Sequence, residues 1–170
     1  APAGSDFLAT TCAAWEEASA ELDSGLEIRR VLLRAGVVLA QDGGALSQML
    51  LPFKLFVGGK VGSGEQVLSW IHIDDFVKIV QFAIVDDRVQ GAINATAPKP
   101  VANKEFTRTA ASVLRRPSPF PAPGFALKVL LGERATLVLD GQKVIPARLQ
   151  ALGFEFKFGE LEGALRDLTS

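Results

Sequence analysis

The stretch LEIRRVLLRAGVVLA, residues 26–40, constrains the fold most, because its Val, Leu and Ile residues are broken mainly by arginines. Such a run is typical of a strand that is buried on both faces for most of its length. The rest of the sequence alternates between helical and extended patterns, which favours an α/β layer architecture with parallel pairing. The sequence therefore predicts a parallel sheet with helices packed against it.

Apolar periodicity and turn residues predict the remaining elements. Pro52 should stop or kink the helix that contains it, because proline lacks an amide proton. A βα chain that begins on a helix and has about three central strands leaves a sheet edge exposed, so the sheet looks half missing. Further strands are predicted at 66–73, 91–97 and 154–158, and helices at 7–22, 45–56, 74–86, 103–116, 124–132, 146–153 and 160–168.

Four prolines between 117 and 123 predict an extended linker, which divides the chain into residues 1–116 and a smaller C-terminal lobe, 117–170.

The 170 residues are 48% apolar, which is enough for one core. The net charge of −1 favours neither a nucleic-acid partner nor an anionic membrane surface. No apolar run is long enough to predict a membrane span, so we expect a soluble protein. The single cysteine fits a reducing compartment such as the cytoplasm.

Cys12 and His72 are the only cysteine and the only histidine, so they can form neither an internal disulfide nor a zinc site of the usual Cys/His kind. The sequence also disfavours a serine hydrolase, because no G-x-S-x-G motif occurs. We interpret Cys12 as a small buried helix residue. His72 precedes two aspartates, and we expect Asp74 and Asp75 to cap the helix that follows.

Two glycine motifs have an ordinary and a functional interpretation. The loop GGKVGSG, residues 58–64, lacks the spacing of a phosphate-binding loop and is expected to be a flexible border of a pocket. Arg34 and Gly36 are predicted at the carboxyl end of a strand, which is the edge where open α/β sheets bind ligands. Gly36 alternatively permits tight packing or a turn, and the sequence does not decide between the two. The charges at 16–17 and 86–87 are interpreted as solvated helix ends.

Three motifs together resemble a known family. They are GGKVGSGEQ, WIHIDD and GQKVIP, in a sequence similar throughout to the atypical short-chain dehydrogenase/reductase (SDR) group of epimerase-like proteins. This group is also labelled SDR family 39U or SulA-like and has a DUF1731 C-terminal segment, and its plant plastid members look especially similar. The resemblance implies an extended-SDR fold, with residues 1–116 forming the C-terminal part of a doubly wound Rossmann sheet and residues 117–170 a small α+β lobe.

The resemblance also implies a cofactor, NADP(H), bound by the full-length parent and weakly or not at all by this chain alone. It implies that Arg34, Gly36, Val37 and Val38 lie near the nicotinamide. The missing glycine-rich N-terminal half, or a complementing chain, would be the partner. The substrate is unknown, and the residues implied to border its cleft are Gly62, Ser63, Gly64, Gln66, Trp70 and His72.

The sequence departs from the family pattern at the catalytic positions. The resemblance implies that residues 7–22 correspond to the helix on which SDR enzymes carry Tyr-x-x-x-Lys. This chain has no tyrosine, and if Glu16 is aligned with the glutamate that commonly follows that lysine by four, the two positions fall on Leu8 and Cys12. The catalytic residues are therefore unknown. The leading hypothesis is part of an NADP-dependent epimerase/dehydratase-like protein, and the alternative is a non-catalytic nucleotide-sensing or interaction protein. The location implied is cytoplasmic, or plastid in a photosynthetic eukaryote.

Overall fold

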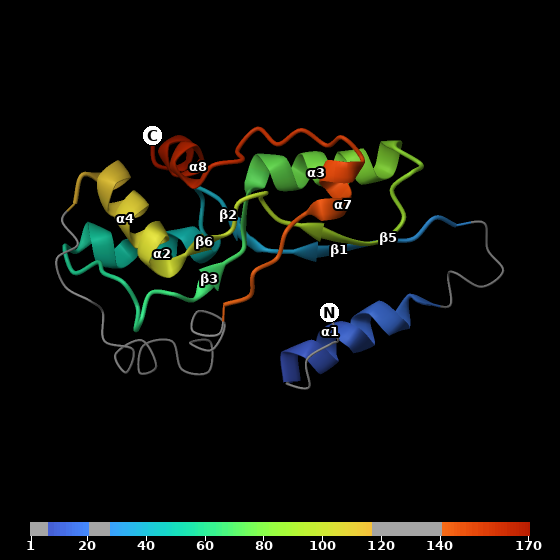
Figure 1. The fold of residues 1–170 in the computed structure, drawn as a ribbon, viewed down its shortest axis with the longest axis horizontal. Helices are drawn as coiled ribbons and strands as arrows, with labels where there is room; N and C mark the ends of the chain where they lie inside the picture. The colour runs from blue at the N-terminus through green and yellow to red at the C-terminus, as the bar shows by residue number, and fades with distance from the viewer. Residues whose placement is uncertain (1–6, 21–27, 117–140) are drawn as a thin grey trace.

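The computed structural model describes residues 7–20, 28–116 and 141–170 of the chain (Figure 1). The predicted linker at 117–123, the predicted helix at 124–132 and Gly25 lie outside these residues. The first helix ends at Ala18, so the helix predicted over 7–22 is too long at its carboxyl end. Three two-stranded sheets and two hydrophobic cores organise the described residues.

The first sheet pair consists of β1 (Val31–Ala35) and β5 (Gly91–Ala95), which run parallel. Helices α3 (Ile73–Val85) and α7 (Ala147–Ala151) cover one face of this pair, as Figure 1 shows. Because β1 and β5 each turn alternate side chains toward these helices, the pair supplies the apolar base of one core. The buried residues of this core are Ile71, Ile79, Ala83, Val89, Ile93, Ala95 and Leu149.

The opposite face of β1 and β5 is largely open. Arg34 on β1 and Ala92 on β5 are exposed. The prediction that this strand is buried on both faces is therefore wrong for the described residues, because only one layer of helices packs against it. The polar and exposed positions mark the face that this layer does not cover.

The predicted strand at 26–40 is divided at Gly36. After this residue, β2 (Val37–Leu39) pairs in parallel with β4 (Trp70–His72) instead of with β5. The predicted strand at 66–73 is likewise divided at Ser69, and β3 (Val67–Leu68) pairs with β6 (Val101–Ala102). This last pair is antiparallel, a feature that the sequence did not indicate.

The second core lies between β2, β4 and three helices. These are α2 (Gly44–Lys54), α4 (Asn103–Leu114) and α8 (Leu161–Leu168). Pro52 lies in the last turn of α2, and the helix ends two residues beyond it, as expected for a residue that cannot continue the ladder. The buried residues of this core are Leu39, Leu46, Leu50, Phe53, Trp70, Ala97, Val101, Phe106, Ala110, Leu161, Ala164, Leu165 and Leu168.

Residues 154–158 do not form the predicted strand. Their burial alternates between half-buried aromatic and exposed charged residues, which is the pattern of an extended backbone. Phe154 and Phe156 pack against the first core, but the amides of Lys157 and Phe158 bond to a side chain instead of a neighbouring strand. Alternation thus reports the extended conformation correctly and does not reveal the hydrogen-bond partner.

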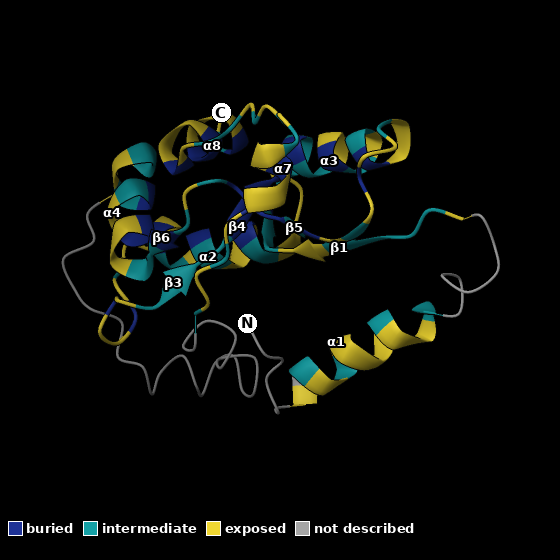
Figure 2. Cartoon of the chain, turned by 45° about the vertical axis from the view of Figure 1, so that its right-hand side comes forward, coloured by how far each residue is buried: buried dark blue, intermediate teal, exposed yellow. Residues whose placement is uncertain are grey.

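Helix α1 (Phe7–Ala18) stands apart from both cores. Among its residues whose burial is described, none is buried, and Figure 2 shows these residues in the colours of exposed and intermediate residues. Phe7 and Trp15 are 80% and 73% exposed. Cys12 is exposed as well, so its interpretation as a buried residue is wrong.

Residues 141–170 pack closely against the rest of the protein, since Leu149 belongs to one core and Leu165 to the other. The boundary predicted between 116 and 117 lies next to residues outside the described ranges and stays a prediction. Within the described ranges, no helix is long and apolar enough to cross a membrane.

Candidate functional site

The carboxyl end of β1 is the place where the chain changes its strand partner. The amide of Gly36 donates to Ala95 O at 3.1 Å, and the next amide, of Val37, donates to Ser69 O at 2.8 Å. A Cβ at position 36 would lie 2.7 Å from Ser69 O and 2.9 Å from Thr96 Cγ2. Of the two interpretations of Gly36, the structure supports tight packing. Its predicted place beside a nicotinamide stays a prediction.

Arg34 is bound by a helix that the sequence did not link to it. Its guanidinium makes two hydrogen bonds of 2.7 Å to the Glu16 carboxylate of α1. This hydrogen-bonded pair lowers the pKa of Glu16 and raises that of Arg34. Glu16 is therefore not the solvated helix-end charge expected from the sequence, and an anionic ligand would have to compete with it for Arg34.

Val37 and Val38 point to opposite sides of β2. Val37 packs against the core formed with α2, α4 and α8, and Val38 packs against the core beneath α3 and α7. Both are half-buried. A ligand at this strand would therefore meet its backbone and the ends of these side chains.

The glycine loop folds onto the beginning of α4. The first amides of this helix, Asn103 N and Lys104 N, donate to Gln66 O and Gly64 O at 2.9 Å. In the other direction, Val61 N donates to Asn103 Oδ1 at 2.8 Å. Because the loop occupies these helix amides, they are not available to a phosphate group. This geometry agrees with the interpretation of residues 58–64 as a structural loop.

Within this loop, the backbone requires glycine at two positions. Gly62 and Gly64 have φ values of 55° and 78°, which side chains other than glycine rarely adopt. Ser63 Oγ accepts a hydrogen bond from Glu65 N at 3.2 Å. Gln66 Nε2 donates to Val61 O at 2.9 Å, and its buried Oε1 has no hydrogen-bond partner among the described residues. Among the described residues of the loop, it is the buried side-chain oxygen that lacks a hydrogen-bond partner.

Trp70 and His72 are 0% and 1% exposed, so in this structure neither presents its side chain to an open cleft. Trp70 Nε1 donates to Lys99 O at 3.0 Å. His72 is the N-cap of α3, since its Nδ1 accepts from Asp74 N at 3.0 Å. The prediction that Asp74 and Asp75 are the caps is therefore wrong, because the imidazole already occupies the position that an aspartate would take.

The two aspartates bind the C-terminal segment instead. Asp75 is fully buried, and its carboxylate accepts the amides of Lys157 and Phe158, both at 2.8 Å. Asp74 is half exposed and pairs with Lys157 Nζ at 3.0 Å, and this hydrogen bond lowers the pKa of Asp74. The motif that looks catalytic in the sequence thus joins a strand, a helix and the C-terminal segment.

A polar strap at 141–146 crosses the ends of the strands. Ser69 Oγ donates to Gln142 O and accepts from Val144 N at 2.9 Å. Asn94 Nδ2 donates to Ile145 O at 3.1 Å. Sequence analysis did not identify this contact, although polar residues at alternate positions of the predicted strand 91–97 indicated that one of its faces meets polar groups.

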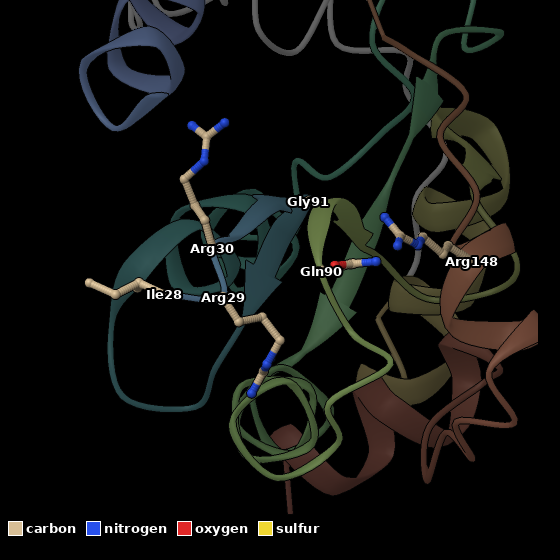
Figure 3. Close-up of a pocket in the computed structure, with 6 residues that line it drawn as sticks. All are labelled: Ile28, Arg29, Arg30, Gln90, Gly91 and Arg148. Atoms are coloured by element: carbon tan, nitrogen blue, oxygen red, sulfur yellow. The ribbon is translucent and has the colours of Figure 1, made fainter. Parts of the chain in front are cut away.

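A pocket of about 390 Å³ lies at the opposite, amino ends of β1 and β5 (Figure 3). Its arginines point in different directions in this view. Arg29 donates to Ala83 O, Ile84 O and Val89 O at 2.6 to 2.9 Å, so it caps the end of α3. Ligands of open α/β sheets bind at the carboxyl ends, so we do not assign this pocket to the cofactor. Its lining residues are Ile28, Arg29, Arg30, Gln90, Gly91 and Arg148.

The described residues fit only part of an NADP(H) site. They offer the carboxyl edge of β1 and β2, but Arg34 is neutralised and the first amides of α4 are occupied. The sequence has no G-x-x-G-x-x-G turn for a pyrophosphate. They also contain no group of three or more His, Cys, Asp or Glu side chains that could hold a metal ion.

Comparison with known proteins identifies close relatives. Residues 122–168 match the family described as Domain of unknown function (DUF1731). The Epimerase family protein SDR39U1 homolog, chloroplastic, of Arabidopsis thaliana is 50% identical to this chain over 165 residues. The alignment covers 97% of this chain and 47% of that protein.

Two solved structures are similar over nearly the whole chain. Human epimerase family protein SDR39U1 (isoform 2) with NADPH has 41% identity and a TM-score of 0.88, over 96% of this chain and 55% of that one. The nucleoside-diphosphate sugar epimerase of Corynebacterium glutamicum has 35% identity and a TM-score of 0.77, over 97% of this chain and 31% of that one. The predicted α/β class and the predicted family resemblance are confirmed, and the chain spans about half the length of its SDR39U1-type relatives.

Proposed function

Because this chain belongs to the epimerase family proteins of the SDR39U1 type and spans about half of their length, we propose that it is the C-terminal portion of an NADP(H)-binding, epimerase/dehydratase-like SDR protein. The observation that carries the proposal is the similarity, at a TM-score of 0.88 and 41% identity, to a human protein crystallised with NADPH. The substrate is not part of the proposal.

The nucleotide site of the proposal uses the carboxyl edge of β1 and β2. Gly36, Val37 and Val38 form a wall beside the nicotinamide, and Arg34 faces the same edge once Glu16 releases it. The Gly62–Gly64 turn and Gln66 border the substrate cleft. Trp70 and His72 support that border from within the core, because both are buried.

The partner in the proposal is a glycine-rich N-terminal half, or a separate chain that replaces it. The open face of β1 and β5 and the exposed Phe7 and Trp15 of α1 support this part, because apolar and unpaired surfaces of this kind are covered in a complete Rossmann fold. When bound, NADP(H) supplies hydride transfer. This chain's own residues supply one wall of the site.

Calorimetric titration with NADPH tests this proposal. The isolated chain is expected to bind weakly or not at all, whereas the chain joined to the remaining part of the Arabidopsis relative is expected to bind. Cys12→Ser in the joined protein is the control and should leave binding unchanged, because Cys12 is exposed on α1. A micromolar dissociation constant for the isolated chain contradicts the one-wall site, and no binding by the joined protein contradicts the function.

A second candidate is a non-catalytic nucleotide-sensing or interaction protein. The observation that favours it is the absence of tyrosine from the sequence. When Glu16 is aligned as the family resemblance implies, Leu8 and Cys12 of α1 fall at the positions of the SDR acid/base pair. NADPH binding by the joined protein without NADPH oxidation in the presence of carbonyl substrates supports this candidate. Oxidation that depends on the added carbonyl compound supports the enzyme.

The location of the parent protein follows from the same relatives. Since the Arabidopsis protein is named chloroplastic, we infer a plastid location for a parent from a photosynthetic eukaryote, and the cytoplasm otherwise. Imaging of a fluorescent fusion of the complete parent protein tests this inference. A fusion that is excluded from the plastids of such a host contradicts the inference.

A further inference from the structure

The carboxylate of Asp75 lies under the C-terminal segment and is not exposed to solvent. Asp75 is 0% exposed, and each of its two carboxylate oxygens accepts one backbone amide: Oδ1 from Lys157 and Oδ2 from Phe158, both at 2.8 Å. Asp75 is the third residue of α3, where the positive end of the helix dipole stabilises an anion. A fully buried carboxylate with both oxygens hydrogen-bonded indicates a specific structural role.

The residues around Asp75 contact the same segment. The His72 ring stacks on Phe158, with 3.8 Å between ring centroids and an interplanar angle of 24°. His72 Nε2 lies 3.2 Å from Asp167 Oδ2 of α8, although its geometry is not that of a hydrogen bond. His72, Asp74 and Asp75 thus all contact residues between 157 and 167.

We propose that Asp75 is the positioning residue that docks residues 154–168 onto the junction of β4 and α3. The segment has no strand partner there, so the carboxylate takes the place of a neighbouring strand and accepts two successive main-chain amides. Because Leu161 and Leu165 of α8 enter the second core, fixing residues 157 and 158 also fixes where α8 meets α4. This role goes beyond the nucleotide site and does not require it.

Asp74 provides a built-in comparison. It has the same charge, is adjacent in the helix and also contacts Lys157, but its side chain is 48% exposed and its contact is an ion pair. Exposed ion pairs contribute little, whereas hydrogen bonds from amides to a buried charge are among the strong ones. The two neighbouring carboxylates should therefore differ sharply in their effect on the segment.

The experiment compares Asp75→Asn with Asp74→Asn in the full chain by amide hydrogen exchange, read residue by residue by NMR. Asparagine keeps the shape but turns an NH2 group toward one of the two amides. Asp75→Asn is expected to speed exchange at Lys157, Phe158 and the amides of α8 on the order of tenfold or more, as expected for a lost charge-assisted hydrogen bond. Exchange in β5 should change far less. Asp74→Asn should leave all these rates within about twofold.

A signature in the unmodified protein keeps the proposal testable if Asp75→Asn does not fold. Amide protons that bond to a carboxylate resonate downfield, so the Lys157 and Phe158 signals should lie downfield of that of Phe156. The absence of this shift overturns the proposal. Equal acceleration in all elements by Asp75→Asn also overturns it, since that result indicates general destabilisation. Neither measurement involves NADPH, so the result is independent of the proposed function.

Discussion

Two regions of this molecule differ in how completely they are packed. The region around α3, α4 and α8 buries apolar residues between Leu39 and Leu168, and its buried carboxylate has both oxygens bonded. The region of α1 and the uncovered face of β1 and β5 leaves Phe7 and Trp15 exposed, and polar contacts to Arg30 and Arg34 hold the helix. The first region has a packed apolar core. The second leaves apolar side chains and one face of two strands uncovered.

The difference separates two kinds of contact that look alike in a list of interactions. Arg34–Glu16 is an ion pair and Asp75 accepts two backbone amides, both at short distances, but Arg34 is 56% exposed and Asp75 is fully buried. Exposed pairs are weakened by solvent and by the entropy of two long side chains. The position of α1 therefore depends on weak contacts, and the position of the C-terminal segment on strong ones.

The largest expected difference is between apolar residues of the two regions. Leu165→Ala should lower the free energy of unfolding by about 2–5 kcal/mol, because Leu165 is fully buried between α8 and its neighbours. Trp15→Ala should change it by less than about 0.5 kcal/mol, because Trp15 is 73% exposed. Urea unfolding followed by circular dichroism measures both. Equal losses would mean that α1 packs as tightly as α8.

A smaller effect is expected at Gly36, where the two regions meet. Gly36→Ala should cost about 1–3 kcal/mol, because the added Cβ lies within 3 Å of Ser69 O and Thr96 Cγ2. Gly163→Ala is the matched control. Its Cβ in α8 meets no atom within 4 Å, so the variant should be neutral or more stable by up to about 1 kcal/mol. Urea unfolding of both variants checks this, and a neutral Gly36→Ala contradicts the close approach.

The smallest effect concerns the pH dependence of the α1 contact. Arg34 lowers the pKa of Glu16 below its ordinary value of 4.5. The stabilisation is therefore fully present above the unfolded-state pKa and is lost as the pH falls through the lower folded-state pKa. The free energy of unfolding of the unmodified chain should exceed that of Glu16→Gln by under about 1 kcal/mol at pH 6, and this difference should shrink with acid. A difference independent of pH would place the effect elsewhere.

The sequence predicted the class of fold and most helices, because apolar periodicity records which side of a helix is buried. It could not predict that strands divide at Gly36 and Ser69, since a change of strand partner depends on residues far away in the chain. The aspartates of the junction were identified as structural but assigned the wrong partners. A cap is a local interaction that the sequence suggests, whereas the bonds from Asp75 to residues 157 and 158 span more than 80 positions. The residues expected near the cofactor also remain predictions, because their contacts would be with a molecule that is not part of this chain.

Asp75 recognises main-chain amides, and this has a consequence for how the protein can change over time. Any residue except proline supplies an amide, so the contact with Asp75 does not itself constrain the side chains at 157 and 158. The number of residues between Phe158 and Leu161 is not free, because an insertion would move α8 out of the core that it enters. At exposed positions such as 155 and 157 the segment should therefore tolerate substitution, whereas an insertion or deletion should be resisted throughout.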